Sequence, residues 1–77
     1  MKEKVLKILS QVMNIPVTEI DENSSPDTVE KWDSLTHINL ILAMEEEFGI
    51  TFSDEEILAM TKVKIIVDTL KKKGLSD

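Results

Sequence analysis

The stretch WDSLTHINLILAMEEEFGI, residues 32–50, decides the fold because its apolar residues recur at helical spacing. We expect a helix that begins at Asp33 or Ser34, since both residues are good N-caps and a carboxylate there complements the helix dipole. Gly49 is expected to adopt the left-handed conformation just beyond this helix. The buried stripe of the helix should comprise Leu35, Ile38, Leu42 and Phe48, widened by Ile41 and Met44.

Ser34 places a hydroxyl group at the entrance of this helix, beside a carboxylate and outside any core pattern. A histidine base acting on that hydroxyl would need an oxyanion hole and an orienting acid, and the sequence indicates neither. We therefore interpret Ser34 as a point at which another protein attaches a group. The alternative is a structural serine whose hydroxyl satisfies a free N–H of the helix start.

Helical periodicity predicts three further helices and no strand. One helix should span Lys2–Asn14. The capping box Ser53–Glu56 should open a short helix that runs to about Met60, and Thr61 should cap a last helix, which Gly74 ends. We expect an all-α fold, a four-helix bundle with a long first loop and a short third helix. The inward residues of the first and last helices should be Val5, Leu6, Ile8, Leu9, Val12 and Met13, and Val63, Ile66, Val67 and Leu70.

Residues 16–32 form the long first loop, which begins at Pro16 because the residue before a proline avoids the helical region. A loop of this length in a domain of 77 residues is usually functional. Its apolar residues are expected to pin it to the core: Val17, Ile20, Val29 and Trp32.

The net charge of −6 is concentrated in the middle of the chain. Residues 19–59 hold twelve acidic residues against one base, Lys31. This balance argues against nucleic acid as a partner and favours proteins with basic patches. It is equally consistent with a solvated face that keeps a small protein in solution.

The absence of cysteine excludes disulfides, thiolate metal sites and a cysteine nucleophile, so any thiol chemistry requires an added group. No apolar run approaches the roughly 20 residues of a membrane span, and Met1–Lys4 leads into a charged amphipathic segment. We expect a cytoplasmic protein with no membrane insertion.

A calcium-binding loop is rejected for the segment from Asp21 to Trp32. Asp21, Asn23 and Ser25 mimic its first ligand positions, but Pro26 stands where glycine is required and Trp32 where glutamate is required. No metal site is expected.

From Asp33 onward the chain resembles the acyl carrier proteins. The residues that carry the resemblance are Asp33-Ser34-Leu35, Ile38, Leu40, the run Glu45–Ile50, and Ser53–Glu56 before Thr61-Lys62-Val63. The resemblance extends over residues 1–77, which we expect to form a single carrier domain. It implies that Ser34 is esterified by 4′-phosphopantetheine, which a phosphopantetheinyl transferase takes from coenzyme A, with Asp33 and Leu35 as part of the attachment site. The thiol of this arm supplies the sulfur that the sequence lacks.

The function that the resemblance implies is that of a monomeric carrier with no catalytic activity of its own. It would carry acyl intermediates as thioesters to the enzymes of fatty acid, polyketide or related lipid biosynthesis. Acyl-loading and acyl-processing enzymes with basic docking patches would bind the helix after Ser34 and its flanks. The partner-binding residues would be Asp33, Glu45, Glu46, Glu55 and Glu56.

The chain departs from the usual fatty acid carrier around the attachment serine. Trp32 replaces a small residue, and Thr36-His37 and Asn39 replace acidic ones, which suggests a specialised polyketide, lipid or aminoacyl pathway. Trp32 is interpreted as a hydrophobic staple rather than a cargo contact. His37 is interpreted as an incidental surface residue, with a contact to the arm's phosphate as the alternative.

Two alternatives stay open: an aminoacyl or peptidyl carrier of the same fold, and an acidic helical interaction module in which Ser34 is only a cap. In the resembled family the seam between the second and third helices can open around an acyl chain. The residues expected to pack this seam are Leu42, Met44, Ile57 and Met60.

Overall fold

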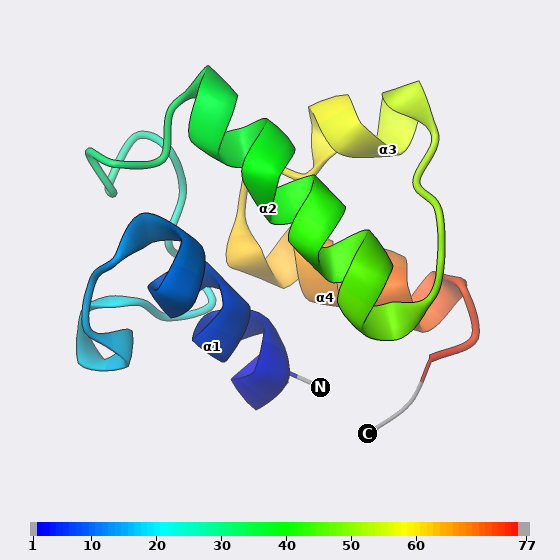
Figure 1. Ribbon diagram of the computed structural model, residues 1–77, viewed down its shortest axis with the longest axis horizontal. Coiled ribbons are helices and arrows are strands. Elements are labelled where there is room, and N and C mark those ends of the chain that lie inside the picture. The colour runs from blue at the N-terminus through cyan, green and yellow to red at the C-terminus, as the bar shows by residue number, and fades with distance from the viewer. Residues whose placement is uncertain (1, 76–77) are drawn as a thin grey trace.

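The computed structural model describes residues 2–75, and this part of the chain contains helices and no strand. Figure 1 shows α2 in front of α4, with the long first loop gathered at one end of the molecule. The all-α fold with a long first loop and a short third helix is confirmed. In chain order the elements are α1 (Lys2–Met13), the 3₁₀ helix η1 (Val17–Glu19), α2 (Ser34–Phe48), α3 (Asp54–Ala59) and α4 (Val63–Lys72).

The first helix ends at Met13, one residue earlier than expected, and the residue that stops it is Asn14, not Pro16. Asn14 has a φ of 55°, a left-handed conformation that asparagine adopts more readily than most residues. The Ile15 N–H then donates to the Ser10 carbonyl at 3.2 Å, and the Ser10 hydroxyl donates to the Ile15 carbonyl at 2.6 Å. These bonds satisfy groups that the helix end leaves free.

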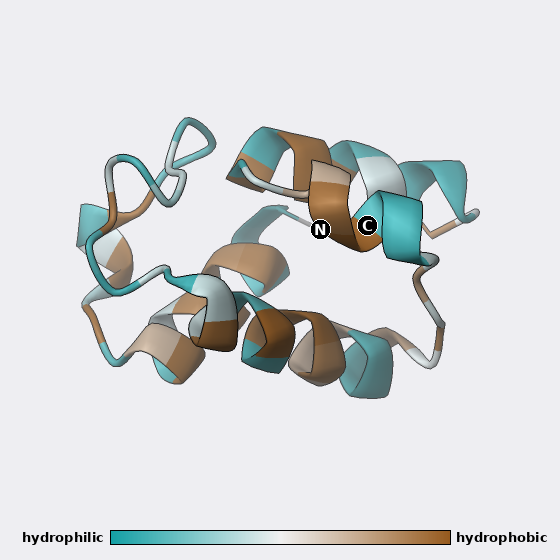
Figure 2. Cartoon of the chain, turned by 90° about the horizontal axis from the view of Figure 1, so that it is seen from above, coloured by the Kyte–Doolittle hydropathy of each residue, from teal (hydrophilic) through white to brown (hydrophobic). Residues whose placement is uncertain are grey.

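The second helix buries a different face from the one expected. Leu35, Ile38 and Leu42 are 73%, 48% and 57% exposed, so the predicted stripe through them is wrong. Apolar residues occur all round the first three turns, so periodicity alone does not distinguish the two faces. Apolar colour runs along most of α2 in Figure 2 and gives way to hydrophilic colour at its C-terminal end. The residues of α2 that are buried are Leu40, Ile41 and Met44.

The core between the helices includes Trp32, which is the largest of its fully buried side chains and is only 1% exposed. This confirms Trp32 as a staple that holds the long loop against the helices. The inward residues expected for α4 are all buried, whereas Leu6 and Val12 of α1 are only partly buried. The other buried apolar residues of the cluster are Val5, Ile8, Leu9, Met13, Ile20, Val29, Leu40, Ile41, Met44, Phe52, Met60, Val63, Ile66, Val67 and Leu70.

The long first loop provides the cap of α4. The N–H groups of Val63 and Lys64 donate to the carbonyls of Ser24 and Glu22, at 3.1 and 2.9 Å. The predicted cap, Thr61, lies one residue too early, because Lys62 is the N-cap and makes no side-chain cap bond. The helix start needs no capping side chain here, since loop carbonyls already satisfy its free N–H groups.

Other parts of the loop pack as expected, with one exception. Ile20, Val29 and Trp32 are buried, but Val17 is 46% exposed and does not pin the loop. Buried Ser24 accepts the Asp21 N–H on its hydroxyl at 2.9 Å. The segment before the second helix is therefore packed and hydrogen-bonded, which gives Ser34 a defined position.

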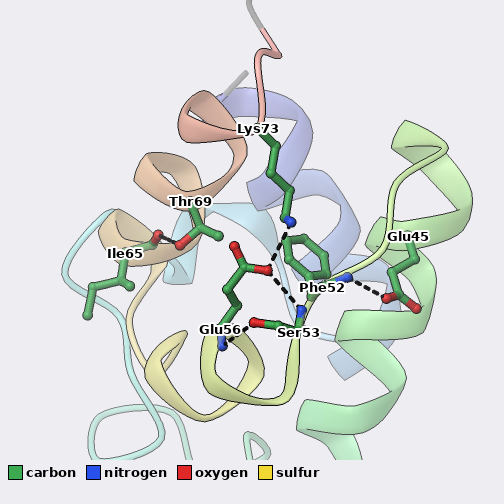
Figure 3. Close-up of polar contacts among 7 residues, drawn as sticks. All are labelled: Glu45, Phe52, Ser53, Glu56, Ile65, Thr69 and Lys73. Carbon is green, nitrogen blue, oxygen red and sulfur yellow. Dashed lines mark hydrogen bonds and ion pairs between the residues drawn. The ribbon is translucent and has the colours of Figure 1, made fainter.

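The short third helix is held mainly by polar contacts, since none of its residues is fully buried. Its capping box is complete, because Ser53 accepts the Glu56 N–H and Glu56 accepts the Ser53 N–H. Figure 3 shows Lys73 of the C-terminal segment reaching Glu56, with 2.9 Å between Nζ and Oε1. In the same view, Glu45 of α2 accepts the Phe52 N–H at 2.8 Å. These contacts attach the beginning of α3 to both α2 and the C-terminal segment.

Within residues 2–75, no helix has the length and apolar character needed to cross a membrane.

Candidate functional site

Ser34 is the first residue of α2, and its side chain is exposed. Asp33 performs the capping, because its carboxylate accepts the Thr36 N–H at 2.8 Å. This bond is the main reason that the pKa of the Asp33 carboxyl is lowered from its ordinary value. With the cap supplied by its neighbour, Ser34 presents a hydroxyl that the helix start does not need.

A hollow of about 320 Å³ opens beside this hydroxyl. Its walls come from the end of the long loop, from the first turn of α2 and from the segment that follows α3. A slightly larger hollow, of about 360 Å³, is lined by residues between Ile15 and Lys31 and does not include Ser34. The residues that line the hollow beside Ser34 are Pro26, Trp32, Asp33, Ser34, His37 and Thr61.

One wall of the hollow is held by a chain of hydrogen bonds through His37. The Trp32 Nε1–H donates to His37 Nδ1 at 3.0 Å, and His37 Nε2 lies 2.7 Å from the Ile57 carbonyl oxygen. The Trp32 and His37 rings are also stacked, with centroids 6.1 Å apart and planes 25° apart. The loop, α2 and α3 are thus joined at one point.

The hydrogen-bond partners of His37 indicate which ring nitrogen carries the hydrogen in this arrangement. An indole N–H can only donate, so His37 Nδ1 must accept and the ring proton must lie on Nε2. The Ile57 carbonyl needs such a donor, because α3 ends at Ala59 and leaves its last carbonyls without helical partners. The interpretation of His37 as an incidental surface residue is wrong: its ring is half-buried and holds two other elements in place.

The side chains that α2 exposes next to Ser34 are mostly apolar. Leu35, Ile38 and Leu42 lie on one face, which we call the apolar face of α2, and exposed Glu46 continues it one turn later. No residue between Ser34 and Met44 is acidic or basic apart from His37. Surface leucine and isoleucine gathered on one face of a small protein are typical of interaction sites.

The five acidic residues expected to bind partners divide into two groups. Asp33, Glu46 and Glu55 are exposed. Glu45 and Glu56 are half-buried and bonded within the protein, Glu45 to the Phe52 N–H and Glu56 to the Ser53 N–H and Lys73. The Ser53 N–H, with Lys73 as a second contributor, lowers the pKa of Glu56. Both half-buried carboxylates hold α3 in place.

Sequence reasoning missed Pro26 and Thr61, which line the hollow, and it missed the apolar face of α2. The exposed residues at positions 35, 38 and 42 repeat at helical spacing, so a signal was present, but it was assigned to the core. Among the described residues, no group of three or more histidine and acidic side chains is arranged to hold a metal ion.

Comparison with known proteins agrees with this geometry. A family model described as the phosphopantetheine attachment site matches residues 3–70. An acyl carrier protein from Buchnera aphidicola subsp. Schizaphis graminum is 37% identical over 73 residues, which are 95% of this chain and 92% of that protein. One from Clostridium acetobutylicum is 39% identical over 69 residues, 90% of each chain.

A solved structure shows the same architecture. The solution structure of a holo acyl carrier protein from Geobacter metallireducens matches with a TM-score of 0.84 at 28% identity, covering 94% of this chain and 83% of that one. The chain therefore belongs to the phosphopantetheine attachment site family, among its acyl carrier protein members.

Proposed function

We propose that this protein is an acyl carrier, with 4′-phosphopantetheine attached through Ser34. The observation that carries the proposal is the free, exposed Ser34 hydroxyl in the first turn of α2, inside the region that matches the family model. A thiol at the end of the added arm holds acyl groups as thioesters. The chain has no cysteine of its own that could do so.

The residues around Ser34 fit such a group. The first turn of α2 has N–H groups and a positive dipole end, both of which favour the negative charge of a phosphodiester. In the attachment reaction the Ser34 Oγ bonds to the phosphorus next to pantetheine, the diphosphate link of coenzyme A breaks and releases adenosine 3′,5′-bisphosphate, and the hydroxyl proton passes to a base. Both ring nitrogens of His37 are hydrogen-bonded to other groups. We therefore propose that a separate transferase supplies the base.

We further propose that partner enzymes dock on the apolar face of α2 together with exposed Asp33, Glu46 and Glu55. The apolar side chains provide contact area next to the arm, and the carboxylates select partners with basic patches. This surface is less acidic at its start than a uniformly charged helix, because Thr36 and Asn39 are neutral. This reduced acidity supports a role in a specialised biosynthetic pathway. Purified fatty acid synthesis enzymes provide the test: loading and elongation of this chain at the rates of the housekeeping carrier would contradict that assignment.

Intact mass spectrometry tests the attachment directly. Incubation of the pure chain with a phosphopantetheinyl transferase and coenzyme A should raise its mass by one phosphopantetheine group. Ser34→Ala should remove the increase while the far-ultraviolet circular dichroism stays unchanged, since alanine is well tolerated just inside a helix.

The matched control is Ser53→Ala. Ser53 is another exposed serine at a helix start, where it caps α3. This variant should accept the group as the unaltered chain does. If Ser34→Ala is modified as well, or if the unaltered chain never gains mass, the proposal is wrong.

A further inference from the structure

We infer that His37 is a positioning residue for the attachment reaction and that it acts on Ser34 through Trp32. This role rests on the proposed attachment at Ser34 and adds which side chains keep that serine where a transferase can reach it. Three features support it: the backbone that leads into α2, the bond between the two rings, and the bond that ties the histidine to α3.

The position of Ser34 depends on the backbone before it, because its own side chain is exposed. The Trp32 N–H donates to the Val29 carbonyl at 3.0 Å, and the His37 N–H donates to the Asp33 carbonyl at 2.8 Å. Asp33 is extended, with a φ of −103° and a ψ of −174°. Only this residue separates Trp32 from Ser34, so a displacement of the tryptophan is passed on to the serine.

The Trp32 ring in turn depends on His37. Because Trp32 is only 1% exposed, its indole N–H needs a hydrogen-bond partner inside the protein. Nδ1 of His37 is that partner at 3.0 Å, and the two rings are stacked. A side chain at position 37 that cannot accept a hydrogen bond would leave a buried donor unsatisfied, which is costly. The indole would then move towards another acceptor and take residues 32–34 with it.

The orientation of His37 is set by α3. Nε2 of the ring lies 2.7 Å from the Ile57 carbonyl oxygen, although the two residues are 20 positions apart in the chain. This carbonyl takes the ring hydrogen on Nε2 and thereby leaves Nδ1 as an acceptor for Trp32. A chain of bonds thus runs from α3 through His37 and Trp32 to the residues that place Ser34.

An ordered helix entrance should affect how well a transferase binds, more than how fast it reacts. The apparent affinity of a protein for a partner falls with the fraction of molecules in the conformation that can bind. Without the bond between Trp32 and His37, Ser34 would occupy several positions, and a smaller fraction would be competent. KM should therefore rise and kcat should change little. One lost hydrogen bond corresponds to a factor of about two to ten.

The test is a double-mutant cycle of transferase kinetics, in which the mass increase is followed at several concentrations of the full chain. His37→Phe keeps an aromatic ring without either bond, and Trp32→Phe keeps a ring without the N–H. Each variant should raise KM by about two- to tenfold. The double variant should be no worse than the more affected single variant, because its second change acts on a bond that is already lost. Circular dichroism at the assay temperature verifies that each variant is folded.

Two further variants separate positioning from general effects on stability. His37→Gln has one donor and one acceptor, so its KM should lie closer to that of the unaltered chain than the KM of His37→Phe does. Ser10→Ala is the matched control, because it also removes a side-chain hydrogen bond, the one from the Ser10 hydroxyl to the Ile15 carbonyl at 2.6 Å. Its KM should equal that of the unaltered chain.

Hydrogen exchange of the Trp32 indole N–H provides a measurement that needs no transferase. NMR should show slow exchange of this hydrogen in the unaltered chain and in His37→Gln, and faster exchange in His37→Phe. If Trp32→Phe does not fold, the comparison of His37→Phe with His37→Gln decides the question. Equal KM values and equal exchange rates for these two variants would overturn the inference.

The kinetic outcomes also distinguish this role from the attachment itself. If both single variants keep the KM of the unaltered chain, or if their effects multiply in the double variant, the positioning role is wrong and the attachment stands. If the unaltered chain gains no mass, the proposed function is wrong and the positioning role fails with it.

Discussion

At the start of α2, capping and attachment are divided between two adjacent residues. Asp33 satisfies the Thr36 N–H, which leaves the Ser34 hydroxyl free for modification. The sequence predicted both residues at this helix start, because capping is a local property. It did not predict the role of His37, because that role depends on the Ile57 carbonyl, which is 20 residues away and free only because α3 ends there.

The lowered pKa values of Asp33 and Glu56 predict a loss of stability in acid. Each ionised carboxylate accepts a backbone N–H in the folded protein, so its pKa lies below the ordinary value of about 4. Their contribution is complete above that ordinary value and is lost as the pH falls through the lower pKa of the folded state. The melting temperature should therefore fall below about pH 4.

Asp33→Asn and Glu56→Gln should each reduce this dependence on pH. Melting temperatures measured by circular dichroism between pH 7 and pH 3 provide the comparison. Asp27→Asn is a suitable control, because Asp27 is an exposed acidic loop residue. Curves that stay parallel for the unaltered chain and all three variants would contradict the assignment.

Among the helices, the sequence predicted all four but indicated the wrong buried face for α2. Helix boundaries depend on local signals such as the capping box of Ser53 and the glycine at position 49, and both are present as expected. The buried face of α2 depends on packing against the other helices. Because apolar residues lie on both sides of α2, only the tertiary structure shows which side is buried.

A pair of neighbouring leucines tests this assignment. Leu40→Ala removes a fully buried side chain and should lower the free energy of unfolding by about 2 to 5 kcal/mol. Leu42→Ala acts on the apolar face of α2 and should change it by less than about 0.5 kcal/mol. Urea denaturation with a common m-value measures both. Equal losses for the two variants would mean that the face is assigned wrongly.

The same pair separates folding from docking. Leu42→Ala should reduce the rate of modification by the transferase at limiting carrier concentration, although it leaves the fold stable. Ile65→Ala, at an exposed apolar residue of α4, should leave this rate unchanged. A transferase that does not distinguish the two variants would exclude Leu42 from its docking surface.

For the whole molecule, the uneven charge has a structural counterpart. Lysines from the two ends of the chain pair with acids of the middle segment, Lys4 with Glu47 at 3.3 Å and Lys73 with Glu56 at 2.9 Å. Lys4 and Lys73 also lie over the rings of Phe48 and Phe52, at 5.5 and 5.4 Å from the centroids. The ends of the chain thus offset part of the acidic charge. The sequence indicated that acids and lysines are unevenly distributed, but it did not indicate which of them form ion pairs.

The remaining negative charge predicts that divalent cations stabilise the fold. Twelve acids against one base in residues 19–59 repel one another in a compact domain. Millimolar magnesium or calcium should raise the melting temperature at low ionic strength, and by more than sodium chloride of the same ionic strength. Thermal scans with chelator and with metal that superimpose would refute the prediction.

One side-chain oxygen, that of Ser34, is proposed to carry the arm. Tandem mass spectrometry of peptides from the transferase-treated protein tests it most directly, because it locates the added group on a single residue. We expect all of the phosphopantetheine to lie on Ser34. A group found on Ser53 or on any other residue would contradict it.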